Sequence, residues 1–210
     1  MVKYTKKQKS DLGYGYMKDY SFFALAFRMK YINRWGLMRC LNSENLLEHS
    51  AQCSVLAHAL AQIGNTYFKK HYNCEKMAVY ALYHDMSEIF TGDLPTPVKY
   101  FNESIRDSYK ALEKNALCNA LSKLPCELKG EYGEILDFEK DKEAKKIVKA
   151  ADKLCAYLKC VDEYKNGNCE FREALKTTQS ALQKLSEDCE ELKYFMDNFT
   201  DPFEKSLDEL

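Results

Sequence analysis

Apolar residues in this chain recur every three or four positions in one segment after another, and this spacing restricts the fold more than any other feature. After Asn45 the stripe consists of Leu46, Cys53, Leu56, Leu60 and Ile63. A second stripe, between residues 140 and 164, consists of Ile147, Ala151, Leu154, Leu158 and Val161. This period is that of an α-helix that buries one face, and no segment alternates as a half-buried strand does. The sequence therefore predicts an all-α fold.

The remaining segments are expected to complete a compact helical bundle. Helices are expected over residues 19–35, 74–90, 102–123 and 125–136, with one or two more at the end of the chain. The stretch TGDLPTPV after Phe90 is expected to be a loop, because two prolines one residue apart cannot continue a helix. Residues 1–18 have no sustained period and are expected to form a flexible N-terminal arm. Since no repeat or linker is visible, residues 19–210 are expected to form a single domain.

The charge of the chain is balanced, which argues against a polyanionic partner. The 31 basic and 32 acidic residues give a formal net charge of −1, so no global field favours a nucleic acid polymer or an anionic membrane. Lysine pairs such as Lys145 and Lys146 are scattered and are expected to be solvated. No apolar run of about 18 residues is present that could cross a bilayer. We therefore expect neither nucleic acid nor membrane partners.

The nine cysteines do not form the pattern of a disulfide framework. Their number is odd, no Cys-x-x-Cys pair occurs, and no secretory signal is apparent ahead of them. Reduced thiols in the cytoplasm are the better expectation. Cys53 and Cys155 lie in apolar helical stripes, where a free cysteine behaves as a small hydrophobe, so we assign them no chemistry.

Two histidines and two aspartates on separate predicted helices suggest a metal site. His49 lies in the first stripe, His84 and Asp85 lie in the segment 74–90, and Asp152 lies among the apolar residues of the long late helix. A carboxylate buried there requires a cation or hydrogen-bond donors. Mixed nitrogen and oxygen ligands suit a divalent transition ion and leave coordination positions for water and a phosphate oxygen. These residues therefore predict a hydrolytic metal centre.

Glu88 is the candidate catalytic residue of this centre. It follows His84 by four positions and Asp85 by three, so on a helix the three side chains share one side. A carboxylate that lies near a metal but outside its ligands can orient an attacking water or move its proton.

Each of these residues also has an ordinary structural explanation. A histidine in an apolar stripe, such as His49, is more often a core residue that has found a hydrogen-bond partner. A His-Asp pair occurs often by chance, and Asp152 can pair with Lys149 or Lys153. From spacing alone, the metal site and the structural explanation both stay open.

The order of these elements resembles that of a known superfamily. A single His, a His-Asp pair and a later Asp on separate helices are typical of the HD superfamily of metal-dependent phosphohydrolases. Longer segments look like those of the bacterial 5′-deoxynucleotidase family, from about residue 20 to the end. These segments are INRWGLMR, ENLLEHS, YHDMSEIFTGDLPTPVKYFN, AADKLCAYLKC and SLDE.

The resemblance implies a role for each matching residue. The metal ligands are expected to be His49, His84, Asp85 and Asp152. The catalytic carboxylate is expected to be Glu88, with Asp93 as a second acid or a substrate contact. The nucleotide is expected to contact Arg34, Trp35, His49, Asp85, Asp93, Leu94, Pro95 and Thr96. The planar guanidinium of Arg34 can donate two hydrogen bonds to a phosphate, and the flat ring of Trp35 can pack on a sugar or base. Without the resemblance, Trp35 would be taken as a core anchor and Arg34 as a surface cation.

The activity implied by the resemblance is hydrolysis of a 2′-deoxynucleoside 5′-monophosphate to the deoxynucleoside and inorganic phosphate, by in-line attack of a metal-activated water. One divalent ion is expected, and cobalt, manganese, zinc, iron and copper all accept such a site. The resemblance also implies a homodimer. Phe195, Phe199 and Phe203 near the end of the chain could form its interface or belong to the core.

Two rival functions stay open at this point. The first is another HD phosphohydrolase activity, on a nucleoside triphosphate, a cyclic nucleotide or guanosine tetraphosphate, which would require more cations around the metal than Arg34 and a few neighbours offer. The second is a catalytically silent, nucleotide-binding helical module. Such a module is expected to have lost a metal ligand or Glu88. All four expected ligands and Glu88 are present here.

Overall fold

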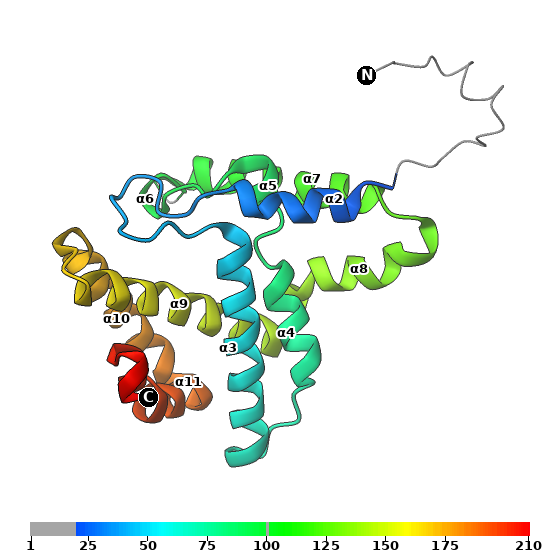
Figure 1. Cartoon of the computed structure of the whole chain (residues 1–210). Helices are drawn as coiled ribbons and strands as arrows, with labels where there is room; N and C mark the ends of the chain where they lie inside the picture. Colours follow the sequence, from blue (N-terminus) through cyan, green and yellow to red (C-terminus); the bar gives the residue numbers. More distant parts are fainter. Residues whose placement is uncertain (1–19, 100) are drawn as a thin grey trace, which may run out of the picture.

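The computed structural model describes residues 20–99 and 101–210. The regular elements of these ranges are helices (Figure 1), and one isolated β-bridge pairs Asn33 with Asn45. The predicted all-α fold is confirmed. The predicted arm over residues 1–18 lies outside the described residues, so the domain start at residue 19 stays a prediction. Within the described ranges, no helix has the length and apolarity to cross a membrane.

Helix α3, Leu46–Tyr67, is the central element, and its start is fixed by a capping box. The Asn45 side chain accepts hydrogen bonds from the backbone N–H groups of Leu47 and Glu48, and the Glu48 carboxylate accepts one from the backbone N–H of Asn45. The predicted start of this helix is therefore confirmed. Helix α4, Cys74–Tyr83, lies beside α3, and α9, Lys142–Lys165, crosses it (Figure 1).

Helix α9 carries the second predicted stripe. Asp141 caps its N-terminus, and its buried residues include most of the stripe, while Leu158 is only half-buried. After α9 the chain turns at Gly167, whose φ of 92° is in the left-handed region that favours glycine. Helix α10, Arg172–Glu187, and helix α11, Glu190–Phe199, then pack along the same core.

Two apolar cores hold the helices together. The larger one joins α3, α4, α9, α10 and α11. The smaller one consists of Phe22, Met86, Ala120, Leu124 and Leu136. These residues connect α2, Phe22–Ala26, with α7, Glu103–Ser122, with α8, Lys129–Leu136, and with the turn that follows α4. The His-Asp pair precedes Met86 directly and so lies where the two cores meet.

The helix predicted over 19–35 is shorter than expected and changes type. Helix α2 is followed by the 3₁₀-helix η1, Phe27–Tyr31, and the chain is extended from Ile32. The predicted stripe was Phe22, Phe23, Ala26, Phe27 and Tyr31, but Phe23, Phe27 and Tyr31 are exposed and Met29 is buried instead. This part of the prediction was wrong. From Phe27 on, the tighter 3₁₀ turn rotates the side chains away from the α-helical stripe.

The single helix predicted over 74–90 is also wrong, because it breaks at the His-Asp pair. Helix α4 ends at Tyr83, residues 84–87 form turns, and the short helix α5 spans Glu88–Thr91. No proline or glycine marks this break. The turns place Met86 in the smaller core, at 0% exposure, and burial of this side chain offsets the interruption of the helix.

The predicted loop after Phe90 contains a short helix. Helix α6 spans Thr96–Lys99 and starts directly after Pro95. Pro97 lies in its first turn, where the missing backbone N–H has no helical partner to lose. The remaining elements are 3₁₀ turns: η2 Cys126–Leu128, η3 Phe138–Lys140, η4 Cys169–Phe171, η5 Asp201–Glu204 and η6 Leu207–Glu209.

Candidate metal centre

The four predicted metal ligands lie together at the crossing of α3, the 84–87 turns and α9. His49, in the first turn of α3, is fully buried, and its Nε2 lies 3.4 Å from Asp152 Oδ1 and 3.7 Å from Asp85 Oδ2. The rings of His49 and His84 are 5.3 Å apart. Residues more than a hundred positions apart in the sequence therefore present nitrogen and carboxylate oxygen atoms to one small volume.

His84 is oriented by the backbone of α4. Its Nδ1 lies 2.7 Å from the carbonyl oxygen of Ala81, so Nδ1 carries the proton of that hydrogen bond. The buried Nε2 has no aligned hydrogen-bond partner among the described residues, although Asp85 Oδ2 lies 3.0 Å away. Burial disfavours the charged imidazole, but the charge of Asp85 outweighs it and raises the pKa of His84 to about 9. A buried Nε2 fixed by a carbonyl on the other nitrogen is the arrangement of a metal-ligating histidine.

The two aspartates remain ionised although both are partly buried. Burial alone would raise the pKa of Asp85, but the charge of His84 holds it down at about 2. Asp152 behaves in the same way, since the hydrogen bond from His49 and the charge of Lys153 hold its pKa well below the usual value. Lys153 Nζ lies 3.0 Å from Asp152 Oδ2, so the expected lysine pairing is present on one oxygen while the other faces His49. The donor set of two imidazoles and two carboxylates fits a divalent transition ion.

Cys53 lies at the same centre, which the sequence did not indicate. Its Sγ is 3.5 Å from His49 Nε2 and 3.3 Å from the Sγ of Cys155. One ligand atom from each of His49, Cys53, His84 and Asp152 falls within a 4.8 Å group. The only sequence signal was the four-residue spacing from His49, which is also the spacing of a core stripe. Burial raises the pKa of Cys53 well above its usual value, so the free thiol is neutral.

Glu88 is the first residue of α5 and is buried, at 6% exposure. Its Oε2 has no hydrogen-bond partner within the described part of the chain. Burial, together with the charges of Asp85 and Asp93, raises the pKa of Glu88 to about 9. A buried carboxyl group with a raised pKa, beside a potential metal site, is a candidate for proton transfer.

Arg34 lies beside this centre and does not have the structural role that the residue alone favoured, and Trp35 follows it in the chain. The Arg34 side chain is only 11% exposed, so it is not a surface cation, and its Nη1 lies 3.6 Å from Asp85 Oδ2. Trp35 is half-buried and packs on Phe171, with the ring centroids 5.3 Å apart. Both side chains donate a hydrogen bond to Glu44, a buried residue that the sequence analysis missed.

The loop after α5 starts at Gly92, whose φ of 72° requires a residue that tolerates the left-handed region. Asp93, Leu94 and Pro95 follow it and are half-buried. The charge of Asp93 acts on both Glu88 and Arg34, which places it at the edge of the centre. Thr96 begins α6, and its side chain lies outside the described part of the structure.

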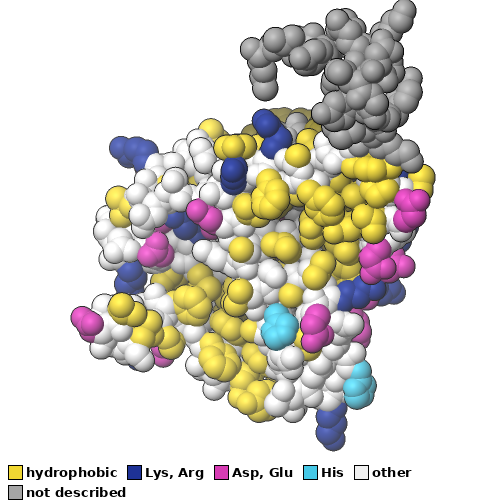
Figure 2. Space-filling view, turned by 45° about the vertical axis from the view of Figure 1, so that its right-hand side comes forward, with side chains coloured by type: hydrophobic (Ala, Val, Ile, Leu, Met, Phe, Trp, Pro, Cys, Tyr) yellow, Lys and Arg dark blue, Asp and Glu magenta, His cyan; other side chains and the backbone are white. Residues whose placement is uncertain are grey.

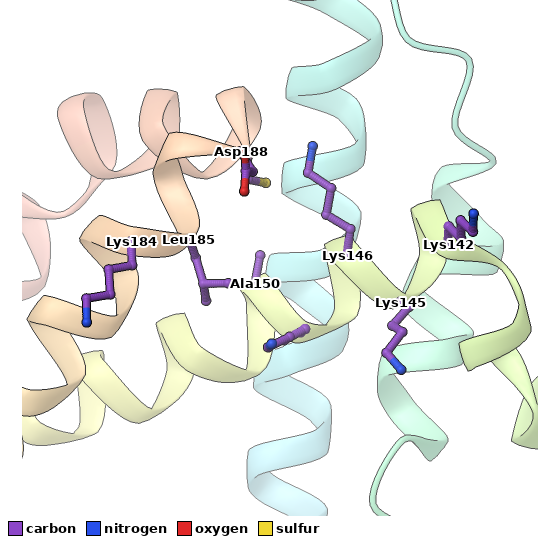
Figure 3. Close-up of a pocket in the computed structure, with 9 residues that line it drawn as sticks. Lys142, Lys145, Lys146, Ala150, Lys184, Leu185 and Asp188 are labelled. Carbon is purple, nitrogen blue, oxygen red and sulfur yellow. The ribbon is translucent and has the colours of Figure 1, made fainter.

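A cavity of about 350 Å³ elsewhere in the molecule contains none of these residues (Figure 3). Its lining includes Lys142, Lys145, Lys146, Lys149 and Lys184. The labelled lysine side chains point in different directions (Figure 3), and Lys145 and Lys146 pair with Glu139 and Glu191. The ammonium groups therefore do not converge on one anion, and the prediction that these lysines are not a nucleic-acid surface is unchanged.

Comparison with known sequences gives long and close matches. A family profile described as 5′-deoxynucleotidase YfbR-like matches residues 21–203. The 5′-deoxynucleotidase YfbR of Salmonella typhi is 48% identical over 195 residues, which cover 92% of this chain and 97% of the relative. The 5′-deoxynucleotidase PM0747 of Pasteurella multocida is 44% identical over 195 residues, which cover 92% of this chain and 99% of the relative.

Comparison with solved structures gives matches in the fold. An HD-domain phosphohydrolase (lin2634) from Listeria innocua superposes with a TM-score of 0.76 at 23% identity, over 87% of this chain and 88% of that chain. The cyanophage S-2L HD phosphohydrolase DatZ, solved with dA and one catalytic Zn²⁺ ion, superposes with a TM-score of 0.61 at 20% identity, over 87% of this chain and 96% of that chain. At these identities the likeness establishes a shared fold.

Proposed function

Since the chain belongs to the YfbR-like 5′-deoxynucleotidase family, we propose that its buried His-Asp centre hydrolyses 2′-deoxynucleoside 5′-monophosphates to deoxynucleosides and inorganic phosphate. The enzyme is a metal-dependent phosphomonoesterase that uses one divalent ion. The observation that carries the assignment to this centre is the buried Nε2 of His84, which lacks an aligned partner within the described residues and lies beside the ionised Asp85.

His49, His84, Asp85 and Asp152 are the residues that would hold the ion. A divalent ion held there supplies a Lewis acid that polarises the phosphoryl group and lowers the pKa of water. The neutral Cys53 thiol lies next to His49, where it packs against the ring. Cobalt, manganese, zinc, iron and copper are all compatible with the four residues. The zinc ion of DatZ supports zinc as one of these candidates.

Arg34 binds the phosphate of the substrate, since its Nη1 lies beside Asp85 while its Nε is held by Glu44. Glu88 accepts a proton from the attacking water or delivers one to the leaving O5′ atom, and its burial keeps bulk water from competing for that proton. Asp93 acts beside it as a second acid or as a contact to the sugar. Leu94, Pro95 and Thr96, which follow Asp93 in the chain, are proposed as further contacts to the nucleotide.

Phosphate release from a panel of substrates tests this function. The panel contains deoxy- and ribonucleoside 5′-monophosphates, deoxynucleoside triphosphates, cyclic nucleotides and guanosine tetraphosphate. The highest kcat/KM is expected for the deoxynucleoside 5′-monophosphates. A higher value for a triphosphate or a cyclic substrate would replace the proposed substrate class, and no release from any of them would favour the silent binding module.

The preference for a deoxy sugar is expected to depend on Trp35. A side chain that packs closely around the 2′ carbon leaves little room for a hydroxyl group, and such pockets discriminate by about 10-fold to 100-fold. Replacement of Trp35 by alanine is therefore expected to lower the deoxy-over-ribo ratio of kcat/KM by about 10-fold or more. Phe27→Ala, at an exposed aromatic residue of η1, is the control. An unchanged ratio in Trp35→Ala would remove Trp35 from this role.

A homodimer is proposed, with an interface at the end of the chain. Phe195 is buried in the larger core, whereas Phe199 and Phe203 are 45% and 50% exposed. Figure 2 shows that hydrophobic side chains also gather on one face of the molecule. Light scattering is expected to give twice the chain mass of 24.4 kDa, and Phe199→Glu with Phe203→Glu is expected to give the monomer. A monomeric wild type would contradict the dimer, and a variant that stays dimeric would place the interface elsewhere.

The proposed location is the cytoplasm. All nine cysteines are free, and the 3.3 Å between the sulfur atoms of Cys53 and Cys155 is a contact between thiols. Free thiols in this number are typical of proteins in a reducing compartment.

A further inference from the structure

One buried carboxylate, Glu44, contacts two of the residues to which substrate binding is assigned. Its Oε2 accepts hydrogen bonds from Arg34 Nε at 3.1 Å and from Trp35 Nε1 at 3.0 Å. Its backbone carbonyl accepts a further bond from the backbone N–H of Arg34, at 2.9 Å. We propose that Glu44 is a positioning residue that holds Arg34 and Trp35 as one unit against the metal centre. This inference rests on the substrate roles proposed above for Arg34 and Trp35.

The two side chains need such a support. Trp35 has a φ of 59°, in the left-handed region that a bulky residue rarely adopts, so its backbone does not hold it in place without other contacts. Arg34 has a long side chain with many rotamers, and its charge is largely removed from water, at 11% exposure. The Glu44 carboxylate offsets that charge and fixes Nε, which leaves the terminal nitrogens of Arg34 for a phosphate and for Asp85, 3.6 Å away.

Glu44 is itself tied to the helix that carries His49. It precedes Asn45, the N-cap of α3, and the backbone N–H of Leu46 donates to the carbonyl of Ile32 at 2.8 Å. His49 lies five positions after Glu44 along this segment. Glu44 therefore sets the position of Arg34 and Trp35 relative to a proposed metal ligand.

A second carboxylate holds the far end of the same loop. Glu163 of α9 is fully buried and accepts hydrogen bonds from the backbone N–H groups of Leu41 and Asn42, at 2.8 and 3.2 Å. It contacts neither Arg34 nor Trp35. Of these two carboxylates, Glu44 is the one that bonds to the side chains of Arg34 and Trp35.

Trp35 is the only tryptophan in the chain, so fluorescence excited at a wavelength that tyrosine does not absorb reports on this position alone. In the ligand-free protein, Glu44→Ala is expected to shift the emission maximum to longer wavelength, because Nε1 loses its partner and the ring becomes more mobile. For deoxynucleoside monophosphates, the same variant is expected to raise KM by about 10-fold to 100-fold, the range for a lost charged hydrogen bond, with a smaller change in kcat. It is also expected to lower the deoxy-over-ribo ratio.

Two further variants make the test specific. Glu44→Gln keeps an oxygen that can accept from Nε1, so it is expected to restore most of the emission spectrum and part of KM, and it covers the case in which Glu44→Ala fails to fold. Glu170→Gln removes the negative charge that Glu170 of η4 presents to Arg39 of the same loop, and it is expected to change neither readout.

The outcomes separate this inference from the proposed function. An unshifted emission maximum and an unchanged KM in both Glu44 variants would overturn the positioning role. A shifted maximum with unchanged KM and sugar preference would overturn it too, because Glu44 would then hold Trp35 without serving the substrate. Wild-type protein that releases no phosphate from any deoxynucleotide would overturn the proposed function, and the substrate part of this inference with it, whatever the fluorescence does.

Discussion

Replacement of Glu88 by glutamine is expected to lower kcat on 2′-deoxynucleoside 5′-monophosphates by about 100-fold to 10,000-fold, the range for a lost general acid or base. Glutamine has nearly the same shape as glutamate but cannot exchange a proton, so the site should stay intact. Metal content is expected to be unchanged, since Glu88 is not among the proposed ligands. A Glu88→Gln enzyme with kcat close to that of the wild type would exclude Glu88 from catalysis.

The same variant should not lose stability, and the difference in stability between this variant and the wild type should depend on pH in a defined way. Burial, Asp85 and Asp93 raise the pKa of Glu88 to about 9, above the value of about 4.3 for an unfolded glutamate. Between pH values near these two pKa values, the folded state holds a proton that the unfolded state releases. The stability that the protonated Glu88 contributes is therefore complete below the unfolded-state pKa, and it is lost as pH rises through the folded-state pKa. Metal-free Glu88→Gln is therefore expected to melt at a higher temperature than metal-free wild type at pH 8, with little difference at pH 5. A lower melting temperature at pH 8 would contradict the raised pKa.

Replacement of His49 by alanine is expected to remove the metal and, with it, the activity. Loss of a residue that only supports a metal ligand costs about 10-fold to 100-fold in metal affinity or activity, so loss of a ligand is expected to cost at least about 100-fold. Metal analysis after gel filtration, together with phosphate release, measures both. His58→Ala is a matched control, because His58 is a half-buried histidine nine residues further along α3. A His49→Ala protein that keeps one equivalent of metal would show that His49 is a core histidine.

Much of the fold follows from the sequence, because its strongest signals are local. The stripes of α3 and α9 and the capping residues Asn45 and Asp141 act within a few positions of one another, and these helices lie where they were predicted. The break after Tyr83 was not predictable in the same way. No proline or glycine marks it, and its cause is the burial of Met86 in a core built from α2, α7 and α8. Such a contact depends on the tertiary arrangement and leaves no period in the sequence.

The candidate site could likewise be predicted only in part from the sequence. The residue types and their placement on separate helices were enough to expect that His49, His84, Asp85 and Asp152 would meet, although the residues alone also allowed a structural explanation. The prediction that Glu88 shares one continuous helix with His84 and Asp85 was wrong, because Glu88 begins a new helix. Glu44 was missed because a single acidic residue in a loop before a helix cap resembles any solvated glutamate. Its importance comes from two side chains that reach it from nine and ten residues away.

Bound metal and phosphate release, measured on the same sample, test most directly whether the buried His-Asp centre is a hydrolytic metal site. The protein is stripped with a chelator, and divalent cobalt, manganese, zinc, iron and copper are added back one at a time with deoxy- and ribonucleoside 5′-monophosphates as substrates. The stripped protein is expected to be inactive, and at least one ion is expected to restore release from the deoxy substrates, rising with metal up to one equivalent per chain. Full activity in a sample shown to contain no metal, or one equivalent of bound metal with no release under any ion, would contradict this function for the centre.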